Sequence, residues 1–176
     1  MAMNVALLRG INVGTAKSVS MAELATVFEN LGFDRVATVL RSGNVVFSSK
    51  RTVPAGAAAS IEAAILKSTG VQSSVLVFSA ADFAAIASAN PLLDIATDGS
   101  KSFVTFIADL PKNLQAPDAA ALAPEVLAVG AAAIYQWMPD GSLQTKVPKS
   151  FWKQFDSPVT ARNWNTVQKL LVLLAE

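Results

Sequence analysis

The order of the apolar patterns in the first 79 residues constrains the fold more than any other feature of the chain. Residues 3–11 are apolar on both faces, which is typical of a central strand. Ser20 and Glu23 follow with the spacing of a capping box and open a helix. Two β-rich runs at residues 36–40 and 45–47 come next, around a tight turn. The pattern to this point is strand, helix, strand, strand.

A second helix and a fourth strand complete this order. Pro54 introduces an alanine-rich segment that Gly70 ends, and residues 74–78 are again β-rich. The order β-α-β-β-α-β is the split βαβ arrangement, in which an antiparallel sheet carries its helices on one face. The sequence therefore predicts an α+β fold whose first half, residues 1–79, is ferredoxin-like.

Residues 80–176 carry a looser version of the same pattern. Ser79 and Asp82 open a helix that Asn90 and Pro91 close. Three strands, a short alanine-rich helix and two later helices are then expected, the strands at residues 103–108, 126–129 and 132–137 and the later helices at 148–155 and 161–174. We therefore expect two related α+β halves with a boundary near residue 80, although no residue-level repeat is visible.

The residue types that are missing exclude several classes of function. The 176 residues include no cysteine and no histidine. A disulfide framework, a thiolate nucleophile, a zinc-thiolate centre, an iron–sulfur cluster and an imidazole base are therefore excluded. Asp94, Asp98 and Asp109 match no calcium or paired-carboxylate spacing, so we expect no metal site. The sequence identifies no cofactor.

The hydrophobic segments are too short for a membrane-spanning helix. The longest, residues 119–134, is interrupted by Pro124, Glu125 and Gly130 and falls short of the roughly 20 apolar residues that a span needs. The start of the chain has the pattern of a strand and lacks the basic and apolar regions of a signal peptide. We therefore expect a cytoplasmic, soluble protein without a membrane partner. The sequence does not predict an oligomeric state.

The charges are sorted along the chain although they nearly cancel. The net charge is +3 over residues 1–79, −5 over residues 80–140 and +3 over residues 141–176. If the outer thirds meet in space, they form a modestly cationic face. Ordinary solvated charge explains the same counts, and both interpretations stay open.

Residues 9–18 contain the ingredients of an anion-binding loop. A strand leads into Gly10, Gly14 and Lys17 before the start of a helix, where free amides and the helix dipole favour a negative charge. The spacing is not that of a phosphate loop, which places four residues between its glycines and a glycine directly before the lysine. Glu23 in the first helical turn also competes with an anion. A plain turn with a solvated lysine is the alternative.

The hairpin tip, residues 41–44, offers Arg41 and Asn44 as candidate ligand-binding residues. Sheets of this topology that recognise RNA stack bases on aromatic side chains of their central strands. Here the two strands offer only Phe47. Recognition of RNA on the sheet face is therefore not favoured, and a structural turn is the alternative to a ligand site.

Residues 160–167 form the third unusual segment. If they open the last helix, Trp164 lies on its apolar stripe, whereas Arg162, Asn165, Thr166 and Lys169 share the opposite face. Asparagine and threonine are middling helix formers. Their presence beside an arginine indicates capping, a buried hydrogen-bond network or a ligand.

These three segments carry a resemblance to a known family. Residues 9–14 (RGINVG), 42–47 (SGNVVF) and 160–167 (TARNWNTV) closely resemble the bacterial domain-of-unknown-function family 1697, an uncharacterised conserved protein, in order and spacing. The resemblance implies an α+β protein with ferredoxin-like halves and implies no established activity. Many relatives have a second glycine where Thr15 stands and a glutamine where Arg41 stands.

The leading functional hypothesis is a binding module for a phosphorylated small molecule, a nucleotide or, less favoured, a nucleic-acid backbone. Arginines supply forked donors and asparagines fix orientation. The candidate ligand-binding residues are Arg9, Asn12, Lys17, Arg41, Asn44, Arg162, Asn163 and Asn165.

Two alternatives stay open. An enzyme that uses lysine, tyrosine or a carboxylate predicts a pocket around a titratable group such as Lys17 or Lys153. A purely structural role predicts that Arg162 and the asparagines form a buried network that holds the fold together.

Overall fold

The structure is a computed structural model that describes residues 1–14 and 18–176. Contacts group the chain into two compact units, Met1–Ala84 with Leu170–Glu176, and Ala85–Lys169. Strand β4 (Ser74–Ser79) ends just before residue 80, near which the sequence predicts a boundary, and helix α3 (Ala80–Ser88) begins there; the units themselves divide after Ala84. The chain passes from the first unit to the second within α3 and returns within α6 (Trp164–Leu174).

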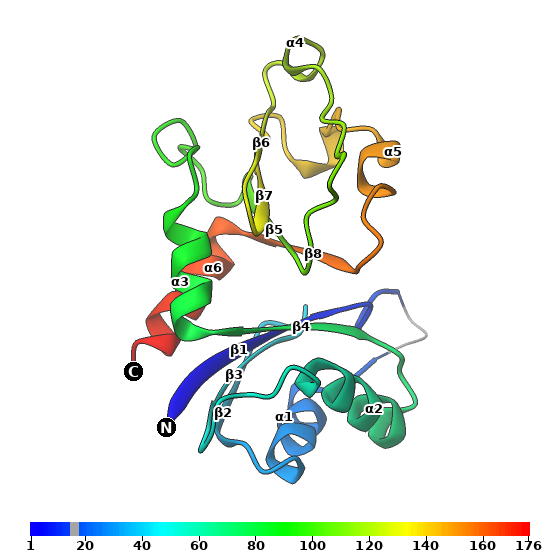
Figure 1. The fold of residues 1–176 in the computed structure, drawn as a ribbon, viewed down its shortest axis with the longest axis vertical. Helices are drawn as coiled ribbons and strands as arrows, with labels where there is room; N and C mark the ends of the chain where they lie inside the picture. Colours follow the sequence, from blue (N-terminus) through cyan, green and yellow to red (C-terminus); the bar gives the residue numbers. More distant parts are fainter. Residues whose placement is uncertain (15–17) are drawn as a thin grey trace. The chain divides into compact units, whose positions relative to one another are not determined.

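The first unit has the predicted order of elements. They are β1 (Ala2–Arg9), α1 (Met21–Asn30), β2 (Asp34–Val39), β3 (Asn44–Ser49), α2 (Ala57–Thr69) and β4. The strands form one antiparallel sheet in the order β2-β3-β1-β4, and α1 and α2 lie on the same face of it (Figure 1). The α+β fold expected from the sequence is confirmed.

The core of the first unit follows from the alternation of side chains along β1. Ala6 and Leu8 point to the helix side and join a buried cluster with residues of α1 and α2. An aromatic group of Phe28, Phe33 and Phe47 lies in this cluster, with the rings of Phe33 and Phe47 4.4 Å apart. Burial of this helix-facing surface is what stabilises the packing of α1 and α2 on the sheet.

The second unit repeats the same sheet topology, with shorter helices between its strands. Its elements are β5 (Ser102–Ile107), α4 (Ala119–Leu122), β6 (Val126–Val129), β7 (Ala133–Trp137), the 3₁₀ turn η1 (Ser142–Gln144), α5 (Lys149–Trp152), β8 (Val159–Asn163) and the first part of α6. The strand order β6-β7-β5-β8 matches that of the first sheet position by position. Ile107, Ile134 and Phe151 are central to its own buried cluster.

The helix expected over residues 161–174 is wrong at its start. Residues Val159–Asn163 form the edge strand β8, paired with β5, and α6 begins only at Trp164. The sequence suggested that Arg162 and Asn165 share a helical face. They do not, because Arg162 lies in β8. The physical reason is that pairing with β5 outweighs the weak local preference of this short segment.

With β8 as a strand, the second half repeats the order of elements of the first half, which the sequence showed only loosely. Both halves now follow the order β-α-β-β-α-β-α if η1 and α5 are taken as the second helical connection. The last strand passes directly into a helix in each half, and its last residue caps that helix. Ser79 Oγ accepts from Asp82 N at 3.1 Å, and Asn163 Oδ1 accepts from Thr166 N at 2.9 Å.

The caps align the two halves residue by residue. Counting back from Ser79 and Asn163, Phe78 in β4 is equivalent to Arg162 in β8. Their partners in the central strands, Val5 and Val104, are equivalent in the same way. A buried arginine in the second half thus stands where the first half has a phenylalanine, which is one reason why no repeat is visible in the sequence.

None of the helices formed by residues 1–14 and 18–176 is long and apolar enough to cross a membrane.

The turn between β2 and β3 gives a first prediction. Gly43 has φ +85°, and a Cβ added there would lie 2.7 Å from Ile11 Cδ1 and 2.8 Å from Leu8 Cβ. Gly43→Ala should therefore lower the free energy of unfolding by about 2–4 kcal/mol through strain and overpacking. Gly32→Ala is the control, because Gly32 has φ +83° with no atom within 4 Å, and it should cost only about 1 kcal/mol. Equal losses in urea unfolding would contradict this account.

The capping box of α1 gives a second prediction. Hydrogen bonds from the main chain and side chain of Ser20 lower the pKa of Glu23. Because the folded pKa is below the unfolded one, Glu23 stabilises the fold at neutral pH, and this contribution disappears as the pH falls through the folded pKa. In urea unfolding, the stability difference between the wild type and Glu23→Gln should therefore be larger at about pH 7 than at about pH 3. A difference independent of pH would contradict it.

Candidate functional site

Two predicted residues, Arg9 and Arg41, lie at one end of the first sheet. Arg9 ends β1, and Arg41 lies in the turn that connects β2 and β3; both are exposed. Leu8 N donates to Gly43 O at 2.8 Å, so the β1–β3 pairing continues up to this turn. The exit of β1 and the hairpin turn are therefore neighbours in the first unit.

The side chain of Asn12 joins these two loops. Its Nδ2 donates to Arg41 O at 2.8 Å and to Val19 O at 3.0 Å, and its Oδ1 accepts from Val19 N at 2.8 Å. Asn12 itself has φ +53°, a left-handed conformation that asparagine tolerates better than most residues. The amide that the sequence analysis assigned to a ligand thus holds both ends of the loop after β1 and the hairpin turn together.

Asn44 serves the hairpin in a similar way. It is fully buried, and its Nδ2 donates to Val39 O at 2.7 Å and to Ser42 Oγ at 3.1 Å. These bonds close the turn from inside. The buried amide of Asn44 therefore contributes to the shape of the site rather than to its exposed surface.

The start of α1 is occupied by its own capping box. Ser20 N donates to Glu23 Oε2, and Glu23 N donates to Ser20 Oγ. A carboxylate already lies at the positive end of this helix, so the helix dipole favours an additional anion less than the sequence pattern suggested. Lys17 lies outside the residues that the structure describes.

Arg162 lies in the second unit and is buried. Only 7% of its surface is exposed, and its Nη1 donates to Thr160 Oγ1 at 2.9 Å and to Ala161 O at 2.8 Å. Burial lowers the pKa of the guanidinium to about 10, so it stays charged at neutral pH. A charge in this position is costly unless hydrogen bonds offset its loss of hydration.

The two remaining asparagines lie where β8 turns into α6. Asn163 caps the helix through Thr166, whose N and Oγ1 both donate to Asn163 Oδ1. Asn165 packs against the loop before β5, because a Cβ at Gly99 would lie 2.2 Å from Asn165 Oδ1. Trp164 N also donates to Gly99 O at 3.0 Å. This junction is a compact backbone corner.

The structure therefore groups the predicted residues by unit. Arg9, Asn12, Arg41 and Asn44 lie together at the end of the first sheet, and Arg162, Asn163 and Asn165 lie together in the second unit. In the first group the arginines are exposed and the asparagines hold the backbone. In the second group the arginine is itself buried.

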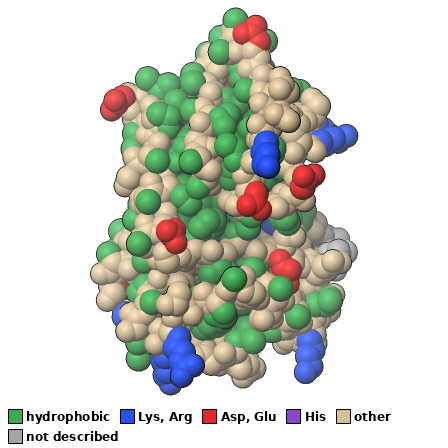
Figure 2. Space-filling model, in the orientation of Figure 1, with side chains coloured by type: hydrophobic (Ala, Val, Ile, Leu, Met, Phe, Trp, Pro, Cys, Tyr) green, Lys and Arg blue, Asp and Glu red, His purple; other side chains and the backbone are tan. Residues whose placement is uncertain are grey.

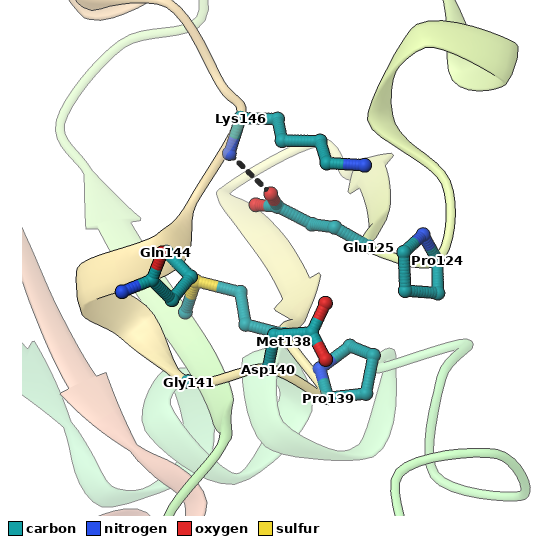
Figure 3. Close-up of a pocket in the computed structure, with 8 residues that line it drawn as sticks. All are labelled: Pro124, Glu125, Met138, Pro139, Asp140, Gly141, Gln144 and Lys146. Atoms are coloured by element: carbon teal, nitrogen blue, oxygen red, sulfur yellow. Dashed lines mark hydrogen bonds between the residues drawn. The ribbon is translucent and has the colours of Figure 1, made fainter.

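A buried carboxylate that the sequence analysis did not identify lies in the second unit. Glu125 is only 6% exposed and accepts from Gln136 Nε2 at 3.0 Å, Thr145 Oγ1 at 2.7 Å and Lys146 N at 2.7 Å. Together with Lys146 and Asp140 it lines a small, shallow hollow that is open to solvent (Figure 3).

The contacts of Glu125 indicate a structural role. Three donors already satisfy the carboxylate, and the Lys146 ammonium donates to Ala123 O. Within the described ranges, no group of three or more acidic residues could hold a metal ion. The network therefore fastens the segment after β7 to the start of β6.

The charges are balanced within each unit. The first unit has seven Lys and Arg against six Asp and Glu, and the second has seven of each. Figure 2 shows side chains of both signs dispersed over the visible face. The uneven distribution of charged residues along the sequence therefore does not produce a strongly cationic unit.

The burial of Arg162 gives a third prediction. Arg162→Ala should lower the free energy of unfolding by about 3–5 kcal/mol, because it removes buried packing and leaves the acceptors on Thr160 and Ala161 unpaired. Arg162→Met keeps most of the volume without the charge and should cost clearly less. Denaturant unfolding of both variants measures the difference. An alanine variant as stable as the wild type would exclude a structural role for this residue.

Comparisons with known proteins agree with this fold and supply no activity. The structure resembles that of the conserved bacterial protein SP0830 from Streptococcus pneumoniae, with a TM-score of 0.69, 25% sequence identity and 98% of each chain covered. No curated protein matches the chain. The model of a family described as a protein of unknown function, DUF1697, matches residues 1–135, which include the first two of the three segments that suggested it. The chain therefore belongs to the DUF1697 family.

Proposed function

We propose that the protein binds a phosphorylated small molecule or a nucleotide at the end of its first sheet, through Arg9 and Arg41. The observation that carries the proposal is the Asn12 clamp, which ties the loop after β1 to the hairpin turn and so fixes two exposed arginines on neighbouring segments.

The chemistry of the site favours phosphate. Arginine presents a rigid fork of donors that matches phosphate oxygens, and its charge makes each hydrogen bond stronger than a neutral one. Backbone that is already held by Asn12 and Asn44 does not have to be ordered when the ligand binds. A nucleic-acid backbone is the less favoured ligand, because β1 carries no aromatic side chain for base stacking.

A structural role for the three polar segments is the second candidate, and it is supported by the internal bonds of Asn12, Asn44 and Asn163. The two candidates differ in what they expect of the exposed arginines. If the segments serve only the fold, Arg9 and Arg41 hold no ligand. The cytoplasmic location expected from the sequence stays a prediction.

Ligand binding to the native state raises the melting temperature by mass action, which gives a direct test. The wild type is heated with inorganic phosphate, a sugar phosphate, adenosine triphosphate and a short oligothymidylate, each at low and moderate salt. We expect a shift with at least one of the small phosphorylated ligands that weakens as salt is added. The double variant R9A/R41A should bind that ligand at least about a hundredfold more weakly, because it removes two charge-assisted bonds, each worth roughly 1.5–3 kcal/mol.

The control is Lys67→Ala, which removes an exposed cation from the last turn of α2 in the same unit. It should leave both the melting temperature shift and the affinity unchanged. If no phosphorylated ligand shifts the wild type, the binding proposal fails and the structural candidate is favoured. If the double variant binds as well as the wild type, the ligand lies elsewhere on the protein.

A further inference from the structure

The four edge strands of the two sheets differ in how well they are protected. An exposed edge presents free main-chain donors and acceptors to any strand that approaches. The edge strand β2 carries a register irregularity and a left-handed Arg35, β6 has only four residues, and β8 carries Arg162, which bonds the main chain of its own strand. The edge strand β4 has none of these features.

The sequence of β4 is well suited to strand pairing. Its six residues, SVLVFS, contain no charge, no proline and no glycine. Three of its apolar side chains, Leu76, Val77 and Phe78, are only partly buried. Uncharged segments of this length and β-propensity pair readily with other strands when they lie on an edge.

The pairing with β1 determines which main-chain groups of β4 point outward. In an antiparallel ladder, the N–H and C=O of one residue point to the same side. Leu8 N bonds Gly43 O on the hairpin side, so Val75, which lies opposite Leu8, must point its groups away from β1. By alternation, Val77 and Ser79 point outward as well.

Glu62 of α2 covers one of these outward groups. Its Oε1 accepts from Val75 N at 2.8 Å. This bond independently confirms the outward direction of the Val75 amide. It also means that a strand approaching β4 has to compete with a carboxylate for the same donor.

The order of residues in β4 fits a second copy of itself. A two-fold axis through Val77 places Val77 opposite its own equivalent, Leu76 opposite Phe78, and Val75 opposite Ser79. The outward residues then meet each other as hydrogen-bonded pairs, and the larger side chains meet as apolar cross-strand pairs. An isologous contact of this kind closes as a dimer.

We propose that two copies of this chain associate through antiparallel pairing of β4 with β4, and that Glu62 limits this association by occupying the Val75 amide. Pairing joins the two first sheets into one sheet of eight strands. The proposal concerns a surface distinct from the arginine site and does not depend on the ligand.

The test measures molar mass by light scattering over a range of protein concentrations. The wild type should shift from one chain toward two as the concentration rises. Glu62→Ala should dimerise about a hundredfold more tightly, because the dimer has to release the Val75 amide from Glu62 in both chains. Glu62→Gln keeps an acceptor oxygen and should stay closer to the wild type. Glu29→Ala on α1 makes the same charge change and should have no effect.

Val77→Pro removes the outward amide on the two-fold axis without removing a bond to β1. Added to Glu62→Ala, it should return the protein to a single chain. If this variant fails to fold, amide hydrogen exchange is measured on the Glu62→Ala protein instead. The exchange rate of the Val77 amide should then fall as the protein concentration rises. The proposal is wrong if the Glu62→Ala protein stays a single chain, or if it still dimerises when Val77→Pro is added. It is also wrong if the hydrogen exchange of the Val77 amide does not change with protein concentration.

Discussion

The pairing of the fourth strand with the first in each half is the constraint on which the rest of the structure depends. β4 returns beside β1, and β8 returns beside β5, so each central strand has a partner on both sides. The following helix then starts without a loop, capped by the last residue of the strand. The same pairing determines which residues of β8 are buried, and Arg162 is one of them.

Most of the first half could be predicted because its signals are local. The capping box at Ser20, the turn around Gly43 and the glycine that ends α2 each mark a boundary within a few residues of where it occurs. β8 lacked such a signal. The helical period of Trp164 and Val167 continues backward into residues 161–163 without a breaker, and only pairing with β5, more than fifty residues earlier, makes them a strand.

The candidate site, too, could be predicted from the sequence only in part. The sequence identified Asn12 and Asn44 as unusual, but it could not show whether their amides serve a ligand or the backbone. That question depends on carbonyl groups that only the folded chain brings near, such as Arg41 O, which is 29 residues from Asn12. Glu125 was missed for the same reason, because its donors on Gln136 and Lys146 lie 11 and 21 residues away.

The route of the chain through its two units has a practical consequence for anyone who wishes to study the halves apart. Residues before and after the second unit both belong to the first unit, since Leu170–Glu176 group with Met1–Ala84. The second unit is thus an insertion rather than a neighbour at the end of a linker. A single cut near residue 80 separates the first unit from the final turns of α6, whereas a short linker from Ala84 to Leu170 would keep all of its parts on one polypeptide.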